Sequence, residues 1–72
     1  MNKTFKMITI AGTSDKNFED AVEAALATAA QSIRHMGWFE VVEQRGRVDD
    51  SGKVIEYQVT LNIGFKIEGD AS

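Results

Sequence analysis

WFEVVEQRGRVDDSGKVIEYQVTLNIGFKIE, residues 38–68, is the stretch that decides the fold, because it predicts one long β-hairpin with its turn at Asp49-Asp50-Ser51-Gly52. Apolar and polar residues alternate along the whole second arm. A period of two means that one face of the sheet is covered and the other can be exposed to solvent. The covered face carries Ile55, Tyr57, Val59, Leu61, Ile63, Phe65 and Ile67, and the other carries Glu56, Gln58, Thr60, Asn62, Lys66 and Glu68.

The second arm is long for so short a chain. As a single strand, Lys53 to Glu68 would span roughly 50 Å, whereas a domain of this size has a radius of gyration near ~11 Å. The arm should therefore bend sharply or run past its own subunit into a neighbour. The 72 residues include no Cys and one His, so disulfides are excluded and a structural metal is disfavoured. Oligomerisation is the remaining aid to stability.

Composition predicts one soluble domain, residues 1–72, ordered over about 3–68 with a short flexible tail at 69–72. The net charge of −3 argues against a nucleic-acid partner, since the eight basic residues are scattered and only Arg45 and Arg47 lie close together. No secretory leader or membrane-spanning apolar run is recognisable, which favours a cytoplasmic protein without a membrane partner.

Two further elements precede the hairpin. Lys3 to Ala11 predicts a strand that ends at Gly12-Thr13-Ser14. Asn17 to Met36 has the apolar spacing of one helix face and six alanines, with Asn17 or Ser14 as the cap. Arg34 and His35 should then lie at its C-terminal end, and Gly37 should supply a left-handed stop.

The fold class is α+β: in the order β-α-β-β, an antiparallel three-stranded sheet curls around one helix, and the first strand can pair with either edge.

Trp38, the only tryptophan, is the first candidate for function, which should be sought on the polar face of the sheet. If Phe39 and Val41 point at the helix, strand parity points Trp38 away from the core. It could stack on a planar ligand, or it could cover a sheet edge or anchor a subunit interface. Gln58, on the polar face, could donate to and accept from the edge of a heterocycle, or could simply be solvated.

Arg45 and Arg47 flank Gly46, a common bulge position, and could bind a phosphate. The alternative is that they pair with carboxylates such as Glu43, Asp49 or Glu56. His35 has no neighbour at metal-ligand spacing, so no metal site is expected. No nucleophile has an adjacent base, so the protein is not expected to be an enzyme.

Four segments resemble the dodecins, small flavoproteins of bacteria and archaea. They are IAGTS, NFEDAVEAAL, GWFEVVEQRGRV and EYQVTLNIGFKIE, and the likeness covers residues 4–68 in the same order and spacing. The resemblance implies a hollow homododecamer in which FMN, riboflavin or a related flavin is sandwiched in pairs between tryptophans of symmetry-related subunits. The stacking residue would then be Trp38, Gln58 would bind the isoalloxazine edge, and Arg45 would assist the FMN phosphate. Some bacterial dodecins also bind coenzyme A.

Arg45 fits this picture only if the strand bulges, because its parity is otherwise opposite to that of Trp38. The leading hypothesis is a flavin storage or sequestration protein that quenches flavin photochemistry. The alternative is a structural oligomer or protein-interaction module without flavin, with Trp38 as an interface anchor. A flavin-dependent oxidoreductase would need an open position beside the flavin, which a closed stack does not leave.

Overall fold

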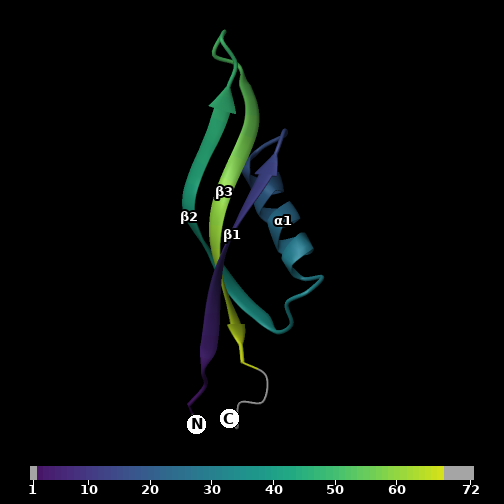
Figure 1. Cartoon of the computed structure of the whole chain (residues 1–72), viewed down its shortest axis with the longest axis vertical. Coiled ribbons are helices and arrows are strands. Elements are labelled where there is room, and N and C mark those ends of the chain that lie inside the picture. The colour runs from purple at the N-terminus through teal and green to yellow at the C-terminus, as the bar shows by residue number, and fades with distance from the viewer. Residues whose placement is uncertain (1, 68–72) are drawn as a thin grey trace.

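The computed structural model describes residues 2–67 and has the order β-α-β-β (Figure 1). The four elements are β1 (Phe5–Ser14), α1 (Phe18–Ala29), β2 (Met36–Val48) and β3 (Val54–Lys66). The strands form one antiparallel sheet in the order β1-β3-β2. The predicted fold class is confirmed, and β1 takes the free edge of β3. The predicted tail at 69–72 lies outside the described residues.

The hairpin turns where the sequence predicts. The N–H of Asp49 donates to the Lys53 carbonyl at 2.9 Å, and the N–H of Gly52 donates to the Asp49 carbonyl at 3.0 Å. Gly52 has φ of 88°, a left-handed conformation that glycine adopts without steric cost. The Asp49 carboxylate also accepts hydrogen bonds from the backbone N–H groups of Ser51 and Lys53, at 2.9 and 3.0 Å. Asp49 therefore holds the turn with both its backbone and its side chain.

The core lies between α1 and the middle of β3. Val59, Leu61 and Ile63 are fully buried, as the alternation of the second arm predicts. Ala21 and Ala25 face them from the helix, and their small side chains let the helix approach the sheet closely. Four partly buried apolar residues pack around this cluster: Ile10, Phe18, Val22 and Leu26.

The helix is shorter than its apolar spacing predicts. Asn17 caps it, accepting a hydrogen bond from the N–H of Asp20 at 2.7 Å, but α1 ends at Ala29 instead of continuing to Met36. Met36 is already paired with Phe65 in the sheet, so strand pairing overrides helix periodicity here. His35, with φ of 64°, is the left-handed residue that turns the chain into β2. The predictions that His35 lies at a helix end and that Gly37 supplies the stop are wrong.

The first strand is displaced along the sequence from its prediction. Gly12, Thr13 and Ser14, which predict a turn, continue β1 and pair with Val59, Gln58 and Tyr57. A Cβ at Gly12 would lie 2.6 Å from the Cβ of Ala25, so this glycine permits close packing of the helix. A packing glycine and a turn glycine look alike in sequence.

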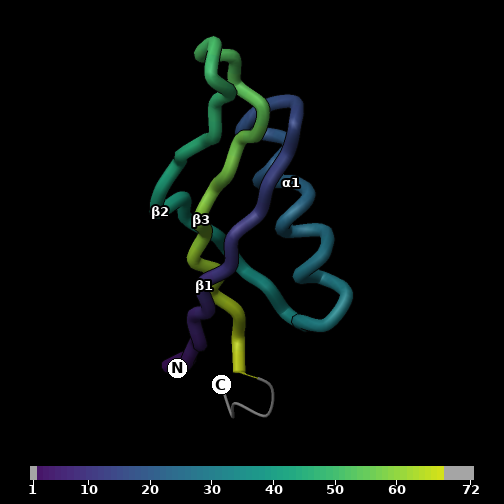
Figure 2. Tube along the Cα trace, turned by 45° about the horizontal axis from the view of Figure 1, so that its top comes forward, coloured from purple at the N-terminus to yellow at the C-terminus, as the bar shows by residue number. Residues whose placement is uncertain are grey.

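The molecule is elongated, measuring 55 × 20 × 13 Å with a radius of gyration of 15.1 Å. The helix has 12 residues and is roughly 18 Å long, so it covers only the middle of the sheet. The β2–β3 hairpin projects beyond it, and the start of β1 and the end of β3 lie together at the opposite pole (Figures 1 and 2). Val48, Val54 and Ile55 near the hairpin tip are exposed. The arm thus runs past the part of its own subunit that could cover it.

Candidate functional site

The face of the sheet away from the helix, called here the open face, is set by the register of the strands. Residues directly opposite each other in an antiparallel pair share a face. The even-numbered residues of β3 alternate with the buried Val59, Leu61 and Ile63 and so define the open face. Their partners on β2 carry the predicted site: Trp38 is opposite Gly64, Glu40 opposite Asn62, Glu43 opposite Thr60, and Arg45 opposite Gln58.

A β-bulge at Val42 decides the position of Arg45. Val41 pairs with Leu61 and Glu43 pairs with the next residue, Thr60, so Val42 is an extra residue in β2. The inserted residue reverses the parity of the β2 residues that follow it as far as Arg47, where the register shifts again. Arg45 therefore shares the open face with Trp38, and the bulge is at Val42 instead of next to Gly46.

Trp38 lies on the open face and is 43% exposed. Its indole ring lies directly over Gly64, where an added Cβ would overlap ring atoms. The ring of Phe5, from β1, contacts it at a centroid distance of 5.0 Å and an interplanar angle of 70°. Trp38 therefore has one side on the sheet and an aromatic neighbour, and a large part of the indole surface stays accessible.

A polar ladder crosses all three strands beside Trp38. The Thr9 hydroxyl donates to the Asn62 side-chain oxygen at 2.7 Å, and the Asn62 amide nitrogen donates to a Glu40 carboxylate oxygen at 3.1 Å. These two bonds fix the amide of Asn62. They also separate the aromatic end of the open face from the end that carries Arg45 and Gln58.

Both arginines have carboxylate neighbours, as the alternative interpretation of the sequence expects. Arg47 Nε donates to Glu56 Oε1 at 3.0 Å. Arg45 Nη1 lies 3.7 Å from Glu43 Oε1, with side chains 63% and 56% exposed, so this pair is weak. Arg45 is thus the guanidinium on this face that a ligand could recruit at lower cost.

One chain brings Arg45 and Gln58 together but keeps Trp38 apart from them. Gly64, opposite Trp38, is six residues along β3 from Gln58, a separation of about 20 Å along the strand. A single three-ring heterocycle is too short to contact both ends from one chain. A three-ring heterocycle that touches both Trp38 and Gln58 would therefore take them from two chains.

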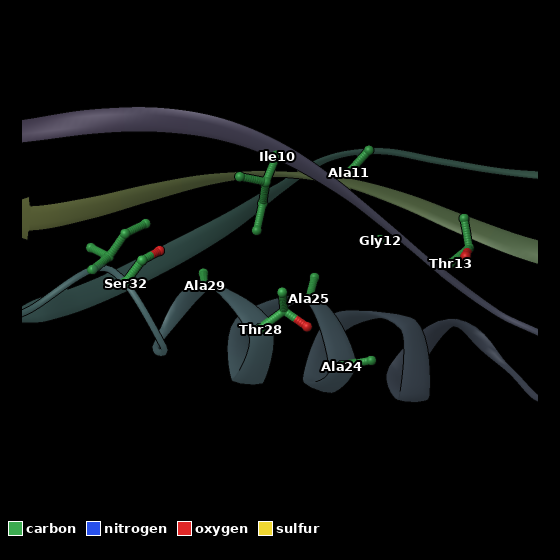
Figure 3. Close-up of a pocket in the computed structure, with 10 residues that line it drawn as sticks. Ile10, Ala11, Gly12, Thr13, Ala24, Ala25, Thr28, Ala29 and Ser32 are labelled. Carbon is green, nitrogen blue, oxygen red and sulfur yellow. The ribbon is translucent and has the colours of Figure 1, made fainter.

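A groove lies elsewhere, between β1 and α1 (Figure 3). This groove has a volume of about 440 Å³ and is lined by residues 10–13 of β1 and by small residues of α1 and the loop after it, among them Ala25, Thr28 and Ser32. Its lining holds no charged or aromatic side chain. This groove was not predicted from the sequence, although the alanine-rich helix surface is its signal.

Two features are absent from the part of the chain that the structure describes. Residues 2–67 contain no group of three His, Cys, Asp or Glu side chains placed to hold a metal ion. In the same range, no helix is long and apolar enough to cross a membrane.

Comparison with known proteins gives one family. The model of the Dodecin family matches residues 4–68. A dodecin of Thermus thermophilus is 47% identical over 68 residues, covering 94% of this chain and 97% of that protein. The structure of dodecin from Streptomyces coelicolor superposes with a TM-score of 0.89 at 38% identity, covering 96% of this chain and 97% of the other. A protein of Mycobacterium tuberculosis named calcium dodecin is 36% identical, covering 88% of this chain and 87% of that protein.

The fold and the open face define a small α+β protein in which a half-exposed tryptophan lies on the side of the sheet that its single helix leaves uncovered. With the family model matching nearly the whole chain, this chain belongs to the Dodecin family.

Proposed function

We propose that this protein stores or sequesters flavin, FMN or a riboflavin-type molecule, by stacking it on Trp38. The observation that carries the proposal is the position of the sole tryptophan. It lies on the sheet face opposite the core and remains 43% exposed, although burial of an indole is favourable. A flat ring with accessible surface suits a planar aromatic ligand. In the proposed site the flavins lie between Trp38 side chains of symmetry-related subunits.

The polar residues of the open face fit the edge of the same ligand. The Gln58 amide can donate and accept at once, as a ring edge with alternating carbonyl and N–H groups requires. Arg45 lies opposite Gln58 and could form bidentate hydrogen bonds with the phosphate of FMN. Its weak pairing with Glu43 leaves most of the guanidinium accessible to such a ligand.

The proposed site is completed by assembly, for which we propose the hollow homododecamer of the family. Since Trp38 and Gln58 are about 20 Å apart along one chain, two subunits must contribute them. Apolar side chains also remain uncovered on the helix side of β2, namely Phe39 and Val41, which are opposite the core residues Ile63 and Leu61. Burial of such residues between subunits would offset the small size of the core.

Binding, without catalysis, is the chemistry these residues support. Indole is electron-rich, so Trp38 stacked on a photoexcited flavin can donate an electron to it and quench its fluorescence and photochemistry. This role needs neither a nucleophile nor a general base. Coenzyme A stays a prediction, because no described contact points to it. Calcium belongs to the name of the Mycobacterium tuberculosis relative.

A fluorescence titration tests the proposal. FMN is titrated with the purified protein while light scattering reports the particle mass. We expect strong quenching at about one flavin per subunit on a particle near twelve chains. An intact large particle that leaves FMN fluorescence unchanged would instead favour the alternative, a structural oligomer with Trp38 as an interface anchor.

A further inference from the structure

Gly64 is an unexpected residue near the end of the central strand of the sheet. It is paired on both sides, with Met7 of β1 and Trp38 of β2, and is buried. Glycine in a strand interior weakens the strand, because it loses more backbone entropy than other residues and brings no side chain to pack. Such a glycine often marks a place where another group approaches the backbone closely. The group that approaches Gly64 is the indole of Trp38.

The contact is with the face of the indole ring. A Cβ built on Gly64 would overlap three consecutive atoms of the six-membered ring, Cε2, Cζ2 and Cη2, at nearly equal distances. A ring edge would bring one atom much closer than its two neighbours, so the Cβ position lies over the ring face. Trp38 therefore lies flat on the backbone of β3 at Gly64, and Phe5 contacts it at 70°.

We infer that Gly64 is a positioning residue of the ligand site: it forms the floor on which Trp38 lies flat, so that the opposite ring face is presented to a planar aromatic ligand. This inference rests on the proposed flavin function. Any side chain at position 64 would lift or rotate the indole. Stacking needs parallel rings in close contact, so a tilted indole would lose ligand affinity even though Trp38 itself is unchanged.

Gly64→Ala tests this floor, and Gly37→Ala is the matched control. Gly37 is adjacent to Trp38, but a Cβ there would meet its nearest atom, the Gly64 carbonyl oxygen, at an ordinary 3.7 Å. Because Trp38 is the only tryptophan, its near-ultraviolet circular dichroism and acrylamide quenching report on the indole without flavin. We expect Gly64→Ala to change both signals and to weaken FMN binding roughly tenfold or more, the equivalent of a lost stacking contact. Gly37→Ala should behave like the parent protein.

The outcomes separate the inference from the proposed function. If the circular dichroism and acrylamide quenching of Trp38 are unchanged in Gly64→Ala, Gly64 does not position the indole, whether or not the protein binds flavin. Changed Trp38 signals together with unchanged FMN affinity would overturn the role of Gly64 in ligand binding. If the parent protein does not bind FMN, the proposed function fails, while the flavin-free signals still decide whether Gly64 positions the indole.

A stability cycle keeps the inference testable if Gly64→Ala assembles poorly. In a Trp38→Ala background, the Cβ that Gly64→Ala adds no longer meets an indole ring. We expect Gly64→Ala to lower the melting temperature by roughly several degrees when Trp38 is present, and to leave it unchanged or raise it when Trp38 is absent. Equal losses in both backgrounds would show that Gly64 is needed for the strand and not for the indole.

Discussion

Trp38 combines two properties that bear on ligand binding. It is held in place, with Gly64 beneath it and Phe5 beside it, and it is still 43% exposed. Fixing the ring before binding lowers the entropy that a ligand must offset. The same rigidity would serve an interface anchor, so substitutions must distinguish ligand binding from assembly.

Trp38→Ala should abolish most flavin affinity and leave the particle intact. The loss of ring stacking is expected to weaken FMN binding roughly ten- to a hundredfold, whereas Gln58→Ala, which removes neutral hydrogen bonds, should weaken it only several-fold. Fluorescence titration gives both dissociation constants, and light scattering gives the particle mass. Tight FMN binding by Trp38→Ala would rule out stacking, and a dissociated particle would assign Trp38 to an interface.

At the scale of elements, the bulge at Val42 is the feature that shapes the open face. Before it, the even-numbered residues Trp38 and Glu40 point to this face; after it, the odd-numbered Glu43 and Arg45 do. One inserted residue therefore places an aromatic ring and a guanidinium on the same surface of one strand.

Arg45→Ala should discriminate between flavins. If the guanidinium contacts a phosphate, the substitution should weaken FMN binding several-fold and leave riboflavin binding nearly unchanged, because riboflavin lacks the phosphate. Arg47→Ala is the matched control, since Arg47 on the same face is already paired with Glu56 at 3.0 Å. Parallel titrations with both flavins measure the effect. Equal losses for FMN and riboflavin would remove the phosphate role from Arg45.

The hairpin turn should make stability depend on pH in the acid range. Hydrogen bonds from the Ser51 hydroxyl and from the backbone N–H groups of Lys53 and Ser51 lower the pKa of Asp49 below its ordinary value. A lowered pKa in the folded state stabilises the fold above the ordinary pKa of about 4, and this contribution is lost as pH falls through the folded pKa.

Asp49→Asn should therefore reduce the melting temperature at pH 6 and make the loss on acidification shallower than in the parent protein. Melting curves from about pH 2 to 6 measure the difference, over the range in which aspartate titrates. Asp50→Asn, which removes a charge at the next position of the turn, is the control. Parallel pH profiles for the parent and Asp49→Asn would contradict the role of this carboxylate.

At the scale of the whole molecule, the elongated sheet is the dominant feature. The molecule is 55 Å long and the helix covers only its middle (Figure 1). Apolar side chains near the hairpin tip and on β2 therefore stay uncovered. The open face is also longer than one ligand. Both observations have the same consequence, which is that this chain is suited to contribute parts of a site to an assembly.

A mixing experiment tests the two-chain site. Trp38→Ala chains and Arg45→Ala/Gln58→Ala chains each lack one end of the open face. If a site takes its two ends from different chains, random co-assembly at equal amounts restores both ends at about a quarter of the sites. If both ends came from one chain, no site would be restored. Titration of FMN into refolded mixtures, beside the two unmixed samples, distinguishes these results.

Much of the fold could be predicted from the sequence, because local signals and tertiary packing agree there. Alternation in the second arm gives the buried Val59, Leu61 and Ile63, and the Asp-Asp-Ser-Gly turn closes the hairpin. The helix end and the start of β2 could not be predicted. Apolar spacing continues through Met36, but pairing of Met36 with Phe65 converts that segment into strand.

The candidate site, like the fold, could be predicted only in part from the sequence. Strand parity alone places Trp38 and Gln58 away from the core, since side chains alternate strictly along a strand. The place of Arg45 depends on a bulge that no residue of the sequence specifies. The role of Gly64 depends on which residue lies across from it, and that is a matter of register. The sequence by itself thus determined the order of the elements, the core face and the family likeness. Only the tertiary structure decided where α1 ends, where β2 begins and which side chains meet, because pairing between distant segments fixes register, bulges and separation.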